Sequence, residues 1–456
     1  MSKRDRRGDR MGAATASDVG TGRLDRRTVL KGVGAGSVVP LAGCLGTYDA
    51  VVGDSSGPEP VRVGVLAPNP QSDFIGRSMV QSAQVAVDER NDDHDGIDDR
   101  AVELVVGDTN GSPLEAKREY QRLVLEENVD VTVGTFASEA LVNIMDEIAE
   151  QETLHLTSGA ATQEVSQLVR EEYERYKYHF RVGPTNDTDL GRAQIGFMND
   201  VAGDIGWESI AVLAEDYPWA DVPWETVQDR IDDTPVENVL SRRYAPSKND
   251  FTDLYDEIAD AGADAAFIMT AHTGNDALFD WSYPNRPAEP PQPQPFAFGG
   301  IHVPMQLPTY YEQTNGACRY GVSYSAATEQ SEITEKTPQF VDKYEETFGT
   351  YPQDMGYYTY DAINLFAEVA ESEESLDSAD LVPVIEDISY TGATGNVRFY
   401  DPDDTYAHDR VYDPDDPTTV GVYFQWQEND EGVGVREVIW PDEYATSEYV
   451  TPPWLE

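Results

Sequence analysis

Three closely spaced glycines near the N-terminus are the first candidates for chemistry. Gly32, Gly34 and Gly36 lie in the stretch RRTVLKGVGAGSVVPLAGC, residues 26–44. A dinucleotide-binding loop needs Gly-x-Gly-x-x-Gly between a strand and a helix, but here the third glycine comes one residue early and no strand-like run precedes it. The Gly-Lys-Ser/Thr ending of a phosphate-binding loop occurs nowhere in the chain. This stretch therefore gives no reason to expect a nucleotide.

The same stretch has the features of an export signal. Arg26 and Arg27 form a twin arginine, a short apolar run follows, and the Leu-Ala-Gly before Cys44 resembles a lipobox. A twin arginine is typical of the pathway that exports folded proteins. We therefore expect residues 1–43 to be a signal, and Cys44 to carry the lipid that anchors the protein at the cell surface. Residues 44–60 are polar and rich in Gly, Ser and Pro, which indicates a flexible tether.

Two kinds of acidic cluster imitate cation sites. NDDHDGIDD, residues 91–99, resembles a calcium loop, but its twelfth position is Val102 instead of a bidentate glutamate. The motif YDPDD occurs at 400–404 and again at 412–416. In so acidic a chain we favour solvated turns and loops over cation sites. The six histidines show no metal-ligand spacing, so we expect neither a metal nor a cofactor.

No catalytic constellation stands out. We find no nucleophile elbow between a strand and a helix, and no acid–base pair that its spacing distinguishes. Apart from Cys44 there is one cysteine, Cys318, so an internal disulfide is not expected. We expect Cys318 to be a buried, small apolar residue, and we expect the protein not to be an enzyme.

The charge balance is extreme. The chain has 85 acidic and 32 basic residues, and beyond residue 43 there remain 81 acidic and 23 basic residues, a net charge of −58. Such a surface repels nucleic acid and anionic lipid, so we expect no nucleic-acid partner and membrane contact only through the lipid. Because molar salt shortens the screening length to about 3 Å, we interpret the acidity as an adaptation to brine.

Alternating strands and helices must position whatever site the protein has. Hydrophobic runs bounded by turn residues predict strands at 61–67, 101–108, 129–134, 153–156, 209–216, 235–244, 263–271 and 319–326. Helices are predicted between them, and strand-like runs at 395–400, 421–427 and 435–440 follow. This alternation is typical of parallel sheets covered by helices, and the length of the chain favours two lobes. Six prolines between 284 and 295 predict an extended surface insertion.

Several motifs occur in a familiar order. VRVGVLAPNPQSDFIGRSMVQSAQVAVDERN is followed by LTSGAAT, HFRVGPTNDTDLG, NDFTDLYDEIADAGADAAFI and TYDAINLFAEVAE. Over residues 61–430 this order resembles the branched-chain amino-acid family of ABC-transporter solute-binding proteins. The resemblance implies a type I periplasmic-binding-protein fold, an α/β fold of two lobes. Each lobe would have a mostly parallel sheet flanked by helices, and a three-strand hinge would join the lobes.

The resemblance also implies how the chain divides. Lobe 1 would comprise 61–183 and 319–390, and lobe 2 would comprise 184–318 and 391–440. Residues 441–456 would form a C-terminal tail.

Ser138 is the first candidate for ligand binding. It opens a helix after the strand that ends in Gly134, and its hydroxyl and the free N–H groups of the first turn suit a carboxylate. The resembling family holds its ligand's carboxylate with a serine at the matching position. A plain N-cap role for Ser138 is the alternative, and it is compatible with binding. In SGAAT, residues 158–162, the resemblance implies a backbone contact from Ala160 and a hydroxyl contact from Thr162.

Aromatic residues are expected to close over the ligand. Trp219 occupies the position where the family has the tyrosine of a Tyr-Gly pair, and an indole there keeps the capacity to cover the ligand. Phe74 or Ile75 falls where the family often has a tyrosine before Gly76, so that wall is altered too.

The main departure from the family lies in FGGIHVP, residues 298–304. Amino-acid-binding members have an acid here that pairs with the ammonium group of the ligand, whereas His302 occupies the position. His302 therefore argues against a standard α-amino acid, and an amide, a urea-like compound or a carboxylic acid becomes a plausible ligand. Glu139, Asp216 or Asp221 are alternative sources of the negative charge.

The resemblance implies a surface lipoprotein that captures a small polar solute between two closing lobes. It would work as a monomer and deliver the solute to permease subunits whose cytoplasmic ATPases supply the energy. The alternative is a surface sensor of the same fold without transport.

Overall fold

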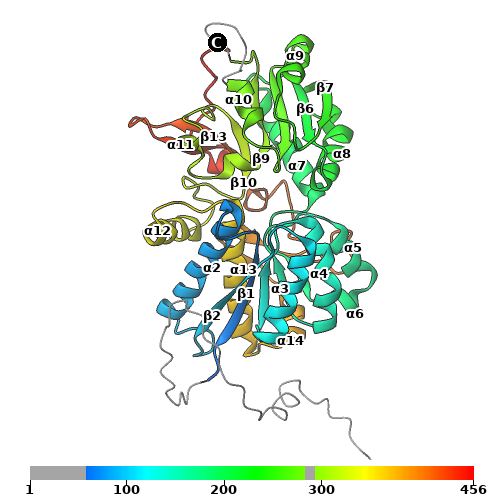
Figure 1. Cartoon of the computed structure of the whole chain (residues 1–456), viewed down its shortest axis with the longest axis vertical. Helices are drawn as coiled ribbons and strands as arrows, with labels where there is room; N and C mark the ends of the chain where they lie inside the picture. The colour runs from blue at the N-terminus through cyan, green and yellow to red at the C-terminus, as the bar shows by residue number, and fades with distance from the viewer. Residues whose placement is uncertain (1–57, 283–292) are drawn as a thin grey trace, which may run out of the picture. The chain divides into compact units, whose positions relative to one another are not determined.

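The computed structural model of the chain describes residues 58–282 and 293–456 (Figure 1). The predicted signal with Arg26 and Arg27, the lipidation residue Cys44, and most of the proline-rich insertion lie outside these residues. Within them, strands and helices alternate along most of the chain and build two α/β lobes, each around its own parallel sheet. No helix of the described ranges is long and apolar enough to cross a membrane.

Lobe 1 contains a five-stranded parallel sheet in the order β2-β1-β3-β4-β5. Its strands are β1 (Val61–Ala67), β2 (Val102–Asp108), β3 (Val131–Gly134), β4 (His155–Thr157) and β5 (His179–Arg181). Its helices are α2 (Phe74–Asp93), α3 (Pro113–Gln121), α4 (Ser138–Gln151), α5 (Glu164–Glu171), α6 (Tyr173–Tyr176), α12 (Lys336–Phe348), α13 (Asp354–Glu373) and α14 (Ser378–Glu386). The late helix α13 packs along the early helix α2, so the two distant parts of the chain share one core.

Lobe 2 contains a four-stranded parallel sheet in the order β7-β6-β8-β9. Its strands are β6 (Ser209–Glu215), β7 (Glu237–Tyr244), β8 (Ala265–Thr270) and β9 (Ala297–His302). Its helices are α7 (Asp187–Phe197), α8 (Asp221–Arg230), α9 (Thr252–Ala261), α10 (Asp276–Ser282) and α11 (Tyr310–Gln313). All residues of β8 and of β9 are buried, as expected for parallel strands that helices cover on both faces.

An antiparallel sheet completes lobe 2. Strands β10 (Val322–Ser325), β13 (Val422–Glu428) and β14 (Gly434–Trp440) lie in the order β10-β13-β14. Strand β10 also lies beside β9, where the backbone N–H of His302 donates to the Ser323 hydroxyl at 3.0 Å. The predicted division of the chain at residue 319 assigns β10 to lobe 1, whereas its pairing with β13 joins it to lobe 2.

The chain passes between the lobes three times, after β5, after β10 and after the hairpin of β11 (Tyr390–Gly392) and β12 (Gly395–Val397). Buried arginines hold these passages. Arg181 donates through Nε to Asp409 at 2.8 Å, and both side chains are fully buried. Arg436 donates through Nε to Glu329 at 2.7 Å, and it is fully buried too. A buried arginine without its carboxylate would be strongly destabilising, so these pairs stabilise the course of the chain between the lobes.

Cys318 is buried, as predicted, and burial raises the pKa of its thiol to about 12, so it is not a reactive thiolate. Two asparagines, Asn110 and Asn186, lie in Asn-x-Ser/Thr sequences, the acceptor motif of N-glycosylation. Asn110 is exposed, whereas Asn186 is fully buried and its side chain caps α7 by accepting from the Asp189 N–H at 2.9 Å. The side chain of Asn186 is therefore inaccessible in the folded protein.

Candidate ligand-binding cavity

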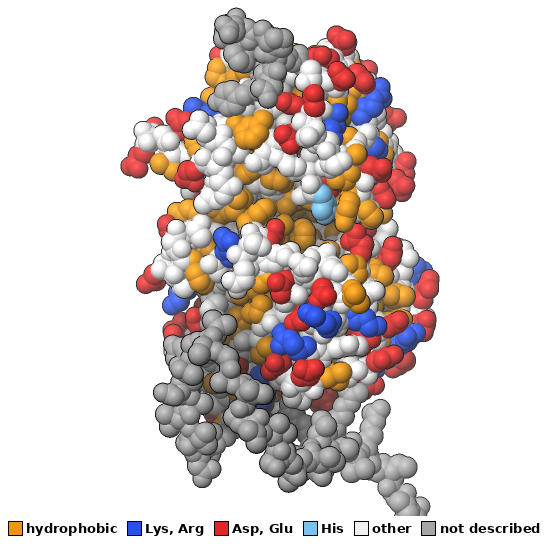
Figure 2. All heavy atoms as spheres, in the orientation of Figure 1, with side chains coloured by type: hydrophobic (Ala, Val, Ile, Leu, Met, Phe, Trp, Pro, Cys, Tyr) orange, Lys and Arg blue, Asp and Glu red, His pale blue; other side chains and the backbone are white. Residues whose placement is uncertain are grey.

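A cavity with about 640 Å³ of open volume lies between the two lobes. Loops that follow β3, β4, β6, β8 and β9 contribute to its walls, together with β10 and the start of α13. These loops stand at the carboxyl ends of parallel strands, where open α/β sheets place their ligands. On the face drawn in Figure 2, hydrophobic side chains gather across the middle, between surfaces rich in acidic side chains.

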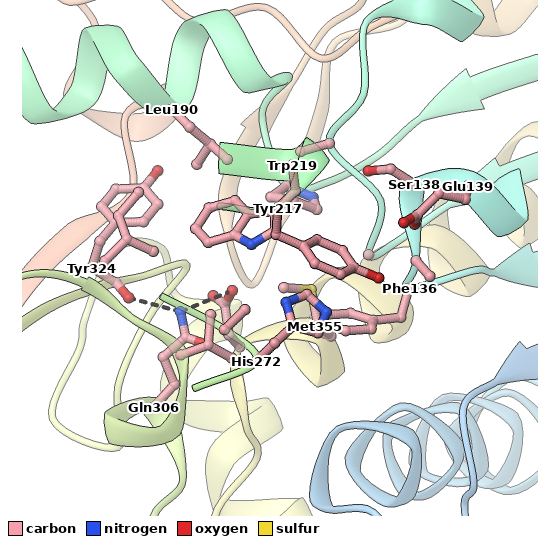
Figure 3. A pocket seen from close by; sticks show the side chains of 18 residues that line it. Phe136, Ser138, Glu139, Leu190, Tyr217, Trp219, His272, Gln306, Tyr324 and Met355 are labelled. Carbon is pink, nitrogen blue, oxygen red and sulfur yellow. Dashed lines mark hydrogen bonds between the residues drawn. The ribbon is translucent and has the colours of Figure 1, made fainter. Parts of the chain in front are cut away.

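The lobe 1 wall is formed by the turn between β3 and α4. Gly134 ends β3 with φ +117°, and a Cβ at this position would lie 2.3 Å from the carbonyl oxygen of Leu66, so only glycine fits. After this turn, Ser138 and Glu139 start α4 and line the cavity (Figure 3). Ala137, the N-cap residue, offers no side-chain cap, and the cavity borders this start of α4, where the Ser138 hydroxyl and uncapped N–H groups suit an anion.

The loop after β4 completes the lobe 1 wall, but with different residues from those expected. Gly159 and Ala161 line the cavity, whereas Ala160 and Thr162 do not. The carbonyl groups of Ala160 and Thr162 both accept hydrogen bonds from the buried guanidinium of Arg181. This arrangement turns the two predicted residues toward the hinge.

Glu215, at the end of β6, organises the lobe 2 wall. Its fully buried carboxylate accepts hydrogen bonds from Trp219 Nε1 at 2.5 Å and from His272 Nδ1 at 2.8 Å. The hydroxyl of Thr270 and the backbone N–H groups of His272 and Thr273 also donate to it, at 3.0, 2.9 and 3.2 Å. Burial raises the pKa of this carboxyl group, but the hydrogen bonds from His272 and Trp219 outweigh burial and lower it to about 2. Glu215 is therefore ionised.

Three rings form the surface of the lobe 2 wall. The Tyr217 and His272 rings stack with their centroids 3.9 Å apart, and Trp219 lies beside them (Figure 3). Tyr217 also interacts with Glu139 of lobe 1, since burial and then the charge of Glu139 raise the pKa of the Tyr217 hydroxyl. The two walls therefore meet at Tyr217 and Glu139.

Polar groups near the hinge bound the cavity on another side. Gln306 donates through Nε2 to the carbonyl of Tyr324 at 2.8 Å and to Asp354 at 3.4 Å (Figure 3). Burial raises the pKa of Asp354 to about 6, although hydrogen bonds from the Ala326 N–H and the Ser325 hydroxyl oppose the rise. The described residues that line the cavity include no lysine or arginine.

Of the predicted site residues, Ser138 and Trp219 line this cavity. His302 does not, although its neighbours Ile301 and Val303 do. The His302 ring is fully buried and lies near Phe298 and Tyr310, with centroids 5.6 and 6.1 Å away.

The remaining predicted residues, Phe74 and Ile75, start α2 and do not line the cavity. Asp73 caps the same helix by accepting from the N–H groups of Ile75 and Gly76. Across residues 58–282 and 293–456, no group of three or more His, Cys, Asp or Glu side chains could hold a metal ion.

A family profile described as periplasmic binding protein matches residues 60–412. The chain belongs to the periplasmic binding protein family. The predicted family and the α/β fold with helix-flanked parallel sheets are therefore confirmed. Periplasmic binding proteins bind solutes, and family membership therefore sets solute binding as the general role of the protein.

Solved structures of periplasmic binding proteins share this fold. An ABC transporter substrate-binding protein from Sphaerobacter thermophilus is 20% identical with a TM-score of 0.66, over 83% of this chain and 96% of its own. A solute-binding protein from Rhodopseudomonas palustris in complex with 3,4-dihydroxybenzoic acid is 18% identical with a TM-score of 0.66, over 86% and 98%. A branched-chain amino-acid binding protein from Streptococcus pneumoniae in complex with isoleucine is 18% identical with a TM-score of 0.65, over 84% and 100%. No curated protein matches the chain.

Several residues of this binding-protein cavity escaped the sequence analysis. His272 and Tyr217 each follow a lobe 2 strand, so the rule that located Ser138 could have located them too. Gln306 follows β9, a strand that the sequence analysis did not predict. Tyr324 and Asp354 carry no comparable signal, because they lie within β10 and at the start of α13.

Proposed function

We propose that the protein is the extracytoplasmic solute-binding lipoprotein of an ABC importer. It captures a small organic solute between its lobes and delivers it to permease subunits that cytoplasmic ATPases drive. Family membership supports the binding role. The proposal that Cys44 carries a lipid, and that this lipid is the protein's contact with the membrane, is supported by the twin arginine and the lipobox-like sequence.

The observation that carries this proposal is that one cavity is lined by both lobes. Ser138 and Glu139 contribute from lobe 1, and Tyr217, Trp219 and His272 contribute from lobe 2. A solute that contacts both walls has more contacts when the lobes are closed than when they are apart. It therefore shifts the equilibrium toward the closed form, which a permease can distinguish from the open one.

The cavity favours a solute with a carboxylate and an apolar body. The Ser138 hydroxyl and the start of α4 suit the carboxylate, and Phe136, Trp219 and Met355 suit the apolar body. Proteins of similar fold are seen with isoleucine and with 3,4-dihydroxybenzoic acid, which both have this composition. An amide or a urea-like compound is the alternative, since the cavity also presents the polar groups of Gln306 and His272.

A thermal-shift screen tests solute capture. The mature protein, in molar KCl, is heated with branched-chain amino acids, benzoates, short carboxylic acids, amides and urea. A solute at roughly 100 times its Kd adds about 2.7 kcal/mol to the free energy of unfolding. We expect at least one carboxylate to raise Tm, and a protein that no member of the panel stabilises would contradict the proposed solute class.

An uptake measurement tests delivery. Cells that lack this protein should no longer import the stabilising solute, and expression of the full chain should restore import. Unchanged import in those cells would favour a sensor without transport.

A further inference from the structure

The lobe 2 wall depends on one buried charge. The carboxylate of Glu215 is fully buried, and six hydrogen bonds to it come from two segments of the chain, Trp219 and the run from Thr270 to Thr273. None of these donors is a lysine or an arginine. Arg243 lies nearby, but its guanidinium donates to the backbone carbonyl of Glu215 at 2.8 Å and to the Asp221 carboxylate at 2.7 Å. An ionised carboxylate in such a place is stable only while its donors stay in position, so the charge and its donors constrain each other.

His272 is oriented by the Glu215 carboxylate through both its ring and its backbone. A carboxylate only accepts hydrogen bonds, so Nδ1 of His272 must carry the proton that it donates at 2.8 Å. The backbone N–H of the same residue donates to the other carboxylate oxygen at 2.9 Å, and Tyr217 stacks on the ring. Backbone and ring are thus both held. Nε2 is the ring nitrogen left for a solute, on a residue that lines the cavity.

Trp219 is oriented by the same carboxylate. Its indole N–H donates to Glu215 at 2.5 Å and is therefore not available to a solute. Because Trp219 also lines the cavity, it presents carbon atoms of its ring there. The same acid therefore leaves a polar nitrogen of His272 and apolar ring atoms of Trp219 for a solute.

We propose that Glu215 is a positioning residue for solute recognition, which rests on the proposed function of the cavity. It holds His272 so that Nε2 hydrogen-bonds a polar group of the solute, and it holds Trp219 so that the indole packs on the apolar part. The solute class this wall selects is an organic molecule in which a hydrogen-bonding group sits beside a flat or branched apolar body. Glu215 itself does not line the cavity and does not touch the solute.

The first test reads the His272 ring without any solute. In ¹⁵N spectra of the full-length mature protein, the ring signals of His272 are assigned by their loss in His272→Ala. We expect the wild-type ring to carry its proton on Nδ1, with a hydrogen-bonded N–H signal that Glu215→Gln shifts or abolishes. Glu147→Gln is the matched control, because Glu147 is also a buried acid that accepts from Gln121 and Lys117, yet it lies outside the cavity lining. This control should leave the His272 signals unchanged.

A wild-type ring protonated on Nε2 alone would overturn the proposal, and that measurement needs no variant at position 215. So would a Glu215→Gln protein, folded by circular dichroism, whose His272 signals match those of the wild type.

The second test couples Glu215 to the solute through its partners. Isoleucine, 4-hydroxybenzoate and 3,4-dihydroxybenzoate are titrated calorimetrically, and a probe that binds the wild type is kept. Glu215→Gln should weaken the affinity for this probe about tenfold, a typical loss when the hydrogen bonds of a buried group are disrupted. In a His272→Ala, Trp219→Phe background the same substitution should weaken the affinity less than about twofold. The two side chains through which Glu215 acts are then absent.

An equal loss of affinity in both backgrounds would show that Glu215 does not act through His272 and Trp219, and would overturn the inference. A wild-type protein that binds none of the three probes would contradict the proposed carboxylate class, while the ring signals still decide the role of Glu215.

Discussion

At the scale of single residues, Ser138 combines a free hydroxyl with the uncapped start of α4. If this hydroxyl binds the solute, Ser138→Ala should weaken the binding of a carboxylate solute by about 1 kcal/mol, or roughly fivefold in Kd. Calorimetric titration with the solute found in the thermal-shift screen measures the loss.

Thr162→Ala is the matched control for Ser138→Ala. The Thr162 hydroxyl accepts from the Glu164 N–H at 3.3 Å and lies outside the cavity lining, so its loss should affect stability and leave affinity unchanged. A weaker affinity in Thr162→Ala with full affinity in Ser138→Ala would move the carboxylate to the hinge side of the wall.

His302 provides a second residue-scale prediction. Its ring is buried near Phe298 and Tyr310, and its Nδ1 accepts from the Met305 N–H at 3.3 Å. We expect His302→Ala to lower the free energy of unfolding by about 2–4 kcal/mol, as truncations of large buried side chains do. Denaturant unfolding measures this cost.

Solute affinity, measured in molar KCl where the variant is folded, separates a structural role of His302 from a ligand-binding role. We expect the affinity to be unchanged in His302→Ala. A large loss of affinity in the folded variant would instead return His302 to the site that the family resemblance implies.

At the scale of elements, the sheet strands were largely predictable because their signal is local. The run 61–67 was predicted as a strand and is β1 to the residue, and 209–216 differs from β6 by one residue. Buried parallel strands are continuous apolar runs, which turn residues delimit clearly. The short strand β5 and strand β9 were not predicted, because β5 has three residues and β9 contains two glycines.

The cavity was less predictable than the sheets, because its contacts join distant segments. Ser138 and Trp219 could be anticipated from their places after strands and from the family resemblance. The Glu215 carboxylate meets His272 and Thr273 only after β6 and β8 pair. A sequence in which 85 residues are acidic gives no sign of which acid is buried.

The start of α7 leads to a prediction about pH. Burial raises the pKa of Asp187 to about 7, although the charge of Arg181 opposes the rise. An unfolded chain has an Asp pKa near about 3.9. Between about pH 4 and pH 7 the folded protein therefore binds this proton while the unfolded chain has lost it, so the contribution of Asp187 to stability rises as pH falls through 7.

Asp187→Asn isolates this effect. Relative to the variant, the wild type should gain about 2 kcal/mol of unfolding free energy between about pH 8 and pH 5. Urea unfolding in molar KCl measures the difference, in which the contributions of the buried histidines cancel. A difference that stays constant, or that shrinks toward low pH, would contradict a protonated Asp187.

At the scale of the whole molecule, charge sets the conditions for stability. Residues 44–456 carry 81 acidic and 23 basic residues, and the face in Figure 2 shows groups of acidic side chains on both lobes. The screening length falls from about 10 Å at 0.1 M salt to about 3 Å at 1 M. We expect Tm to rise steeply with KCl over this range, as calorimetry at several concentrations would measure.

An uncharged osmolyte such as sucrose separates screening from general exclusion effects. It should recover only a small part of the stability that KCl provides, because it leaves the repulsion between carboxylates in place. A Tm that does not depend on KCl would contradict the interpretation of the acidity as an adaptation to brine.

The position of the Trp219 indole also makes its fluorescence sensitive to a solute. The chain has seven tryptophans, and among the residues that line the cavity Trp219 is the single one. Its N–H is bonded to a buried carboxylate while it borders the space that a solute would fill. Indole emission depends on the polarity and contacts of the ring, so arrival of a solute would change the colour or intensity of this emission. The protein thus contains its own optical reporter of solute capture, and Trp219→Phe is the variant that switches it off.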